Sequence, residues 1–291
     1  MLLQDVKRNK RKTVFIVTLF FMFITLFIYF ITLWLSDGSY IAVPIALLFA
    51  FLSSFISYYN SDKIILKLNK ARPANEQQDQ QLKLLLEGLC IATGLPMPKL
   101  YVIEDTALNA FATGRNPENA VICVTTGLIE TLDKYELEGV LAHELSHVRN
   151  YDILLQTVVT IMVGLVVILS DIIFRFGLHH SDDDNKVGPI IMIISLVFLI
   201  LSPIFATLMQ LAISRNREYL ADASAADITR NPGGLINALK KLTDDKEPLE
   251  AANKSCASMF IVTPFKGKKA STLWSTHPAT EDRIKKLENI H

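Results

Sequence analysis

The stretch 133-DKYELEGVLAHELSHVRNYD-152 carries the strongest signals in this chain of 291 residues. Asp133, followed three residues later by Glu136, resembles a capping box with Asp in place of Ser or Thr, which predicts the start of a helix. That helix is expected to pass through the HELSH segment (143–147) and to run directly into an apolar stretch that begins at Ile153. Histidines four residues apart share one helix face, so both imidazoles can reach one metal ion.

The HELSH segment has the H-E-x-x-H pattern, in which His143 and His147 are the candidate metal ligands and Glu144 is the candidate general base. Zinc lowers the pKa of its bound water toward ~7 and polarises a scissile carbonyl, and Glu144 can take the water proton and pass it to the leaving amine. The alternative is a solvated helix face that happens to carry two histidines. We interpret the segment as a site for one Zn²⁺ per chain with a hydrolytic role.

Four long apolar runs dominate the rest of the chain, in which 51% of the residues are hydrophobic. At a rise of ~1.5 Å per residue each is about long enough for a helix to cross a hydrocarbon core of ~30 Å. The alternative, buried core helices of a soluble protein, fits poorly with runs of this length and so little charge. The predicted spans are Val14–Leu35, Ile41–Tyr58, Ile153–Phe174 and Ile190–Ile213.

Lysine and arginine collect on one side of these spans, which the positive-inside rule reads as cytoplasmic. One opposite loop carries Asp37, the other carries three aspartates at 182–184 with Lys186, and Arg175 on that second loop fits badly. The predicted localisation is the cell membrane, multi-pass, with the N-terminus and the metal site in the cytoplasm. A cleaved signal peptide is the competing interpretation of residues 1–35, but the apolar run is too long and another follows at once. The basic residues are Lys7, Arg8, Lys10, Arg11 and Lys12 before the first span, Lys63, Lys67, Lys70 and Arg72 after the second, and Arg215 and Arg217 after the fourth.

Charge and cysteine content exclude other classes of protein. The formal net charge is +0 and no basic stripe is visible, so nothing indicates a nucleic-acid partner. Cys90, Cys123 and Cys256 have no C-x-x-C spacing, which fits neither a disulfide framework nor a cysteine zinc site. Polypeptide substrates and the lipid bilayer are the partners that remain.

A catalytic zinc keeps three protein ligands, and Glu218 is the candidate for the third. The longer pattern with a third histidine is excluded, because Asn150 and Ile153 stand where glycine and histidine would be required. The third and fourth spans must be antiparallel neighbours, so their cytoplasmic ends deliver His147 and Glu218 to the same place and depth. Asp222, one turn beyond Glu218, could accept the second ring N–H of a bound histidine. The alternative is a solvated acidic face that pairs with Arg215 and Arg217.

The spans divide the chain into four parts. Residues 1–59 form a two-span anchor, 60–152 the first part of a cytoplasmic domain, 153–213 a second two-span hairpin, and 214–291 the rest of that domain. In the first cytoplasmic part we expect a helix over Leu82–Thr93 that ends at Gly94. Short strands are expected at Lys99–Ile103 and Ala120–Thr125. The second part is predicted to be mostly helical, with a break at 231–234 and an irregular segment near 264–268.

These residues together resemble the HtpX family of bacterial membrane zinc metallopeptidases, relatives of the type I CAAX prenyl proteases. The resemblance covers nearly the whole chain, through the four spans, the H-E-x-x-H helix, Arg217–Asp222, Asn109–Gly114 and Ser275–Pro278. It implies a mainly α-helical membrane protein, with four transmembrane helices and a zincin-like α+β cytoplasmic metalloprotease domain.

The resemblance also implies roles for individual residues. Zinc would be held by His143, His147 and Glu218, with Glu144 as the base. An extended substrate would pair with Asn109, Ala110, Phe111 and Ala112, and His277 and Arg283 would donate to its carbonyl. The alternative for the last two is a helix N-terminus at Pro278 with Arg283 solvated. The implied role is quality control of misfolded or damaged membrane proteins.

Two rival functions use the same residues. A sequence-selective processing protease would need a closed chamber, for which this chain is short. A silent membrane scaffold or chaperone would retain zinc for folding alone, but it would have no use for the general base Glu144.

Overall fold

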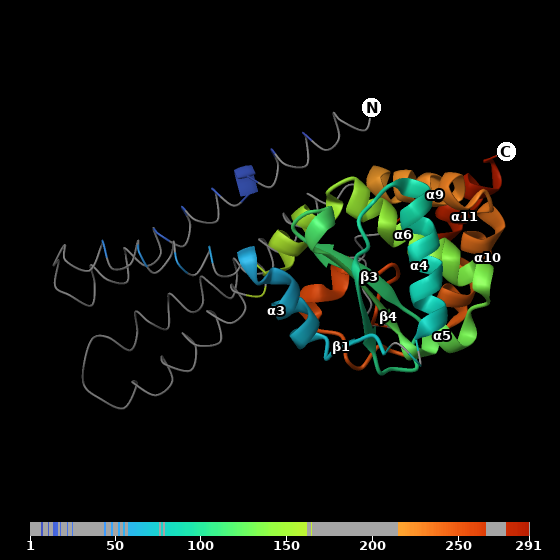
Figure 1. The fold of residues 1–291 in the computed structure, drawn as a ribbon, viewed down its shortest axis with the longest axis horizontal. Helices are drawn as coiled ribbons and strands as arrows, with labels where there is room; N and C mark the ends of the chain where they lie inside the picture. The colour runs from blue at the N-terminus through green and yellow to red at the C-terminus, as the bar shows by residue number, and fades with distance from the viewer. Residues whose placement is uncertain are drawn as a thin grey trace.

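The computed structural model describes residues 58–75, 79–161, 215–265 and 278–290, together with Gln77, Gly164 and isolated positions before residue 56 (Figure 1). The four predicted spans fall wholly or mostly outside these residues. Only Tyr58, residues 153–161, Gly164 and isolated positions of the first two spans are within them. Within the described ranges, no helix is both long enough and apolar enough to cross a membrane.

A four-stranded sheet forms the centre of the described domain, with the order β1-β2-β4-β3. The strands are β1 (Arg72–Pro73), β2 (Lys99–Ile103), β3 (Ala110–Gly114) and β4 (Ala120–Thr125). β2 and β4 are parallel, and β3 runs antiparallel to β4 with Ala110 opposite Val124. The predictions for the β2 and β4 segments are confirmed with the same bounds, while β3 is a strand that the residue pattern did not indicate.

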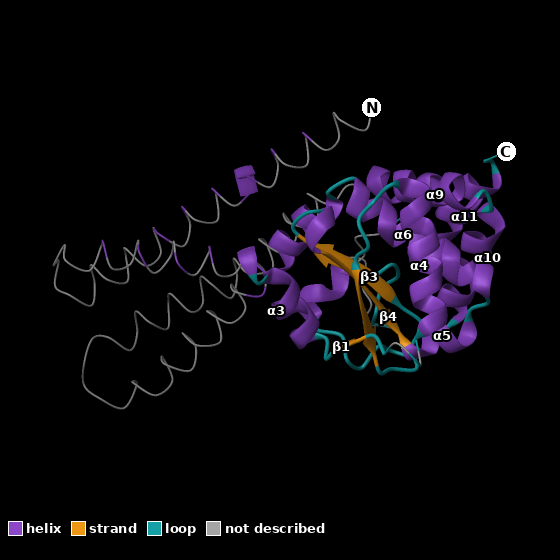
Figure 2. Ribbon diagram, viewed as in Figure 1, coloured by secondary structure: helices purple, strands orange, loops and turns teal. Residues whose placement is uncertain are grey.

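Helices cover both faces of this sheet (Figure 2). Successive strand residues point to opposite faces, so Ala110 and Ala112 pack with the larger helical layer, while Phe111 packs with the smaller one. The larger layer contains α4 (Gln80–Thr93), α6 (Lys134–Arg149), α9 (Arg215–Thr229), α10 (Pro232–Asp244) and α11 (Thr280–Glu288). The smaller layer contains α3 (Ser61–Leu68) and the 3-10 helix η2 (Lys254–Met259). Short connections are η1 (Pro117–Asn119) and α5 (Thr126–Thr131).

Local signals set the ends of the helices. The capping box predicted at the start of α6 is confirmed, because the Asp133 side chain accepts from the Glu136 backbone and the Glu136 side chain accepts from the Asp133 backbone. α4 ends at Gly94, as predicted, with φ at 68°. The predicted break at 231–234 is shorter than expected, since Asn231 caps a helix that resumes at Pro232.

The expectation of one continuous helix from α6 into the run after Ile153 is wrong. α6 ends at Arg149, and Tyr151 has a φ of 58°, which lies in the left-handed region. A new helix then covers residues 152–161. A non-glycine residue with positive φ interrupts the α-helical hydrogen bonds, so the chain changes direction between His147 and Asp152.

The edge of β3 opposite β4 is partly covered by residues 260–262. The Ile261 backbone N–H donates to the Ala110 carbonyl at 2.9 Å, and Phe260 pairs with Phe111 as an isolated antiparallel bridge. The Asn109 side chain adds a hydrogen bond from Nδ2 to the Val262 carbonyl at 3.1 Å. This edge segment (260–262) therefore occupies one end of the strand that faces α6.

Candidate metal centre

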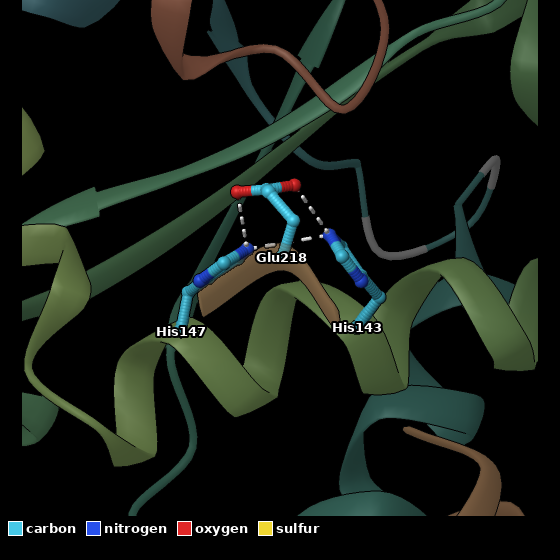
Figure 3. Close-up of side chains that lie close together, drawn as sticks. All are labelled: His143, His147 and Glu218. Carbon is cyan, nitrogen blue, oxygen red and sulfur yellow. Dashed lines mark hydrogen bonds and ion pairs between the residues drawn. The ribbon is translucent and has the colours of Figure 1, made fainter. Parts of the chain in front are cut away.

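Three buried side chains from two helices converge on one point (Figure 3). The Nε2 atoms of His143 and His147 are 3.3 Å apart. The Glu218 carboxylate faces both rings, with Oε2 at 3.8 Å from Nε2 of His143 and Oε1 at 3.7 Å from Nε2 of His147. The structure thus brings together all three residues that the sequence analysis selected as ligands.

The positions of these side chains follow from the two helices that carry them. On α6 the four-residue spacing places His143 and His147 on the same face, one turn apart. Glu218 lies on α9, three residues after the first described residue of that helix, Arg215. α6 and α9 pack against each other, so Glu218 reaches the space between the two rings.

Each imidazole has a second buried carboxylate behind it. Nδ1 of His143 lies 3.0 Å from Oδ1 of Asp222, and Nδ1 of His147 lies 3.1 Å from Oδ2 of Asp152. A carboxylate accepts only, so each Nδ1 carries the proton and each Nε2 of a neutral ring presents a lone pair to the centre. The sequence analysis identified Asp222 for such a contact but missed Asp152.

The residues fit a metal ion of the zinc type. Three acceptor atoms that face one another in a buried space repel unless a cation lies between them. Bonds of ~2.0–2.1 Å in tetrahedral geometry place ligand atoms ~3.3–3.4 Å apart, close to the separation of the two Nε2 atoms. Two imidazoles and a carboxylate are also a ligand set that catalytic zinc uses, with a fourth position open.

Glu144 lies beside this centre and faces the sheet. Burial raises the pKa of Glu144 to about 7, against the opposing effects of His147 and of a hydrogen bond from the Ala112 backbone. A carboxylate with a pKa near neutrality can both accept and release a proton at physiological pH. The contact with Ala112 also places Glu144 next to the middle of β3.

The charges around the metal centre shift the pKa values of its other groups as well. Burial lowers the pKa of His143 to about 4. For His147 burial acts in the same direction, but the Asp152 and Glu218 carboxylates outweigh it and raise the pKa to about 9. Burial opposes ionisation of Asp222, yet the Arg283 guanidinium holds the pKa of this carboxyl at about 2. A metal ion binds imidazole only in its neutral form, so metal binding would displace any proton from His147.

Comparison with known proteins identifies the family. The model of peptidase family M48 matches residues 76–291, which includes both helices of the metal centre. The chain belongs to peptidase family M48. It is a metallopeptidase, and this confirms both the resemblance and the class of enzyme predicted from the sequence.

Individual relatives of this M48 peptidase match over nearly its whole length. A protein named protease HtpX homolog from Dictyoglomus thermophilum is 45% identical over 98% of this chain and 93% of its own. Another of the same name from Listeria monocytogenes is 40% identical over 100% of both chains. Among solved structures, the crystal structure of S. mikatae Ste24p has a TM-score of 0.53 and 20% identity. The alignment covers 99% of this chain and 66% of the Ste24p chain, and the two share the same fold.

The M48 peptidase places Arg283 in contact with the centre rather than in solvent, so the solvated alternative for Arg283 is wrong. Its side chain is 1% exposed. Nε and Nη2 donate to Asp222 at 2.9 and 2.7 Å, Nη1 donates to the Ile261 carbonyl at 3.1 Å, and Nη2 lies 3.4 Å from Nε2 of His143. His277 lies outside the described residues.

The segment expected to pair with substrate in the M48 peptidase is the edge strand β3 with the residue before it. The Phe111 ring is buried on the far side of the sheet and packs edge-on against Phe260, with centroids 5.0 Å apart. Ala110 already accepts from the edge segment, and Asn109 holds the same segment through its side chain. Ala112 is the member of the set that faces Glu144.

Proposed function

We propose that this chain is a membrane-anchored zinc endopeptidase in which His143, His147 and Glu218 hold one Zn²⁺ and Glu144 is the catalytic base. The observation that supports this most strongly is the convergence of three buried acceptor atoms next to a carboxyl whose pKa is raised toward neutrality. Asp222 would accept the ring proton of His143 and so fix its orientation.

The chemistry follows from this arrangement. A bound zinc ion would lower the pKa of a coordinated water toward ~7 and polarise the scissile carbonyl. Glu144 takes up the proton of the attacking water and passes it to the leaving amine. An extended substrate adds to β3 at the Ala112 end, because the Ala110 carbonyl is already used by the edge segment. His277 would donate to the substrate carbonyl, while Arg283 holds Asp222 in place.

Chelator-sensitive cleavage of casein tests the proposed function directly. The full chain, purified in detergent, should cleave casein with zinc present. Cleavage should fall to the background level after removal of the metal with 1,10-phenanthroline, because the proposed mechanism needs the cation to activate the attacking water. Added zinc should restore it. Cleavage that persists in a preparation shown by elemental analysis to hold no metal would contradict the proposal.

The site geometry favours this function over a scaffold or chaperone. A scaffold or chaperone that holds zinc for folding needs a closed shell of ligands, and it gains nothing from a buried carboxyl beside that shell. Glu144 is 2% exposed and forms no ion pair with another residue that the structure describes, so its burial destabilises the fold without a catalytic use. A selective processing protease would share the centre, and we favour open cleavage of misfolded or damaged membrane proteins.

The proposed membrane arrangement has four spans: 14–35, 41–58, 153–174 and 190–213. Residues 1–59 and 153–213 are then the two hairpins, and residues 60–152 and 214–291 form one cytoplasmic domain at the cell membrane. The described parts of both cytoplasmic segments pack into one body through α6 and α9 (Figure 1), as this division requires.

Labelling of single cysteines tests that topology. Cysteines introduced at Lys10 and Lys246, in a variant whose native Cys90, Cys123 and Cys256 are replaced by serine, should react with a membrane-impermeant maleimide only after the cells are opened. A cysteine at Asp183 should react in intact cells, because the 175–189 loop is predicted to lie outside. Equal labelling of positions 183 and 246 in intact cells would exclude the antiparallel hairpin.

A further inference from the structure

Asp152 and Arg217 form an ion pair beside His147 that neither the motif nor the family resemblance indicated. Oδ2 of Asp152 lies 3.1 Å from Nδ1 of His147, and Oδ1 lies 3.2 Å from Nη1 of Arg217. The Asp152 side chain is 2% exposed and that of Arg217 is 13% exposed. A buried carboxylate therefore lies between an imidazole and a guanidinium.

The same order of imidazole, carboxylate and guanidinium occurs on the other side of the centre. There Asp222 lies between Nδ1 of His143, at 3.0 Å, and the guanidinium of Arg283, which it binds through two hydrogen bonds. Each histidine is thus supported by one carboxylate and one arginine. We propose that Asp152 and Arg217 are positioning residues for His147, equivalent to Asp222 and Arg283 for His143.

The location of the pair explains how it acts on two ligands at once. Arg217 directly precedes Glu218 on α9, and adjacent helical residues point ~100° apart, so Glu218 faces the rings while Arg217 reaches past them. Asp152 begins the helix that follows the Tyr151 turn. The ion pair therefore ties α9 to the start of the helix that follows α6, and it fixes both the His147 ring and the approach of Glu218.

Physical chemistry gives the two residues different duties. Asp152 selects the tautomer of His147 that has the proton on Nδ1, which leaves Nε2 available to a metal. Arg217 gives Asp152 an opposite charge in a buried position, where an unpaired carboxylate would be costly. Arg217 contacts Asp152 through the single nitrogen Nη1, so a lysine at position 217 can supply the same charge to Asp152, whereas a glutamine cannot.

The test measures zinc affinity by competition with a chromophoric chelator on the full chain in detergent, without turnover. Outer carboxylates and their partners typically contribute ~10–100-fold to metal affinity. We expect the dissociation constant of zinc to rise by that factor in Asp152→Asn, to rise by a smaller factor in Arg217→Gln, and to return close to wild type in Arg217→Lys. Asp227→Asn is the matched control, because Asp227 lies on α9 as Arg217 does and forms an exposed ion pair with Arg230, just after the end of that helix.

A second measurement separates positioning from simple loss of folding. Thermal unfolding is followed for each variant without zinc and at one fixed excess of zinc, since a ligand stabilises the folded state by an amount that rises with the logarithm of its concentration divided by its dissociation constant. A positioning role reduces the upward shift that zinc produces, whereas a purely structural role lowers the metal-free midpoint and leaves that shift unchanged.

The inference rests on the proposed zinc site, and the two fail differently. If wild type binds no zinc, the site itself is wrong. If wild type binds zinc and both Asp152→Asn and Arg217→Gln bind it as tightly as Asp227→Asn, only the positioning role is overturned.

Discussion

Glu144→Gln should hold a full equivalent of zinc and cleave casein slower by about 10²–10⁴-fold or more, because the substitution removes the base and leaves all three proposed ligands. Glutamine has nearly the shape of glutamate and can still accept the hydrogen bond from the Ala112 backbone. The loss should therefore appear in kcat, with KM little changed. Zinc content by elemental analysis and initial rates on casein measure the two quantities on the same preparation.

Glu138→Gln is the matched control for this prediction. Glu138 lies on α6 as well, fewer than two turns before Glu144, and it is only partly buried. Its variant should cleave at the wild-type rate. If Glu144→Gln kept activity close to wild type, another group would have to be the base.

Glu218→Ala should lose its metal during purification, since two imidazoles remain where catalytic zinc needs three protein ligands. Asp222→Ala removes only the acceptor behind His143, so zinc should bind ~10–100-fold more weakly and some activity should remain. The expected order of metal content is wild type, then Asp222→Ala, then Glu218→Ala. Elemental analysis of variants dialysed side by side decides that order.

Other carboxylates in the chain serve as controls for Glu218. Glu104 has a 62% exposed side chain and pairs with Arg72, and Glu281 is exposed in the first turn of α11. Replacement of either by alanine should leave the zinc content unchanged. A full equivalent of zinc in Glu218→Ala would show that the third ligand lies elsewhere.

The sequence predicted those features that depend on short spacings. The capping box at Asp133, the left-handed end of α4 at Gly94, and the bounds of β2 and β4 follow from residue type within a few positions. The sequence also predicted Glu218 as the third ligand, from the expectation that two neighbouring spans end side by side. The expected depth of His147 assumed that α6 continues as a helix beyond Arg149, which it does not, yet His147 and Glu218 still lie together.

Asp152 shows where such reasoning stops. On a continuous helix, residues five apart point ~140° away from each other, so His147 and Asp152 would face different ways. They meet because α6 ends and Tyr151 adopts a positive φ, which is rare for a non-glycine residue and has no reliable sequence signal. The cover on the β3 edge by the segment 260–262 was missed for a related reason, since it joins residues about 150 apart in an irregular stretch.

The assembly of the centre from α6, α9 and α11 has a consequence for biosynthesis. A ribosome produces both histidines and Glu144 long before Glu218, and it produces Arg283 later still. A nascent chain that has reached only residue 161 carries both imidazoles but lacks Glu218, Asp222 and Arg283. For most of its translation, the polypeptide therefore lacks residues that the proposed metal site needs. On the proposed ligand set, it could hydrolyse a peptide bond only after α9 has packed against α6.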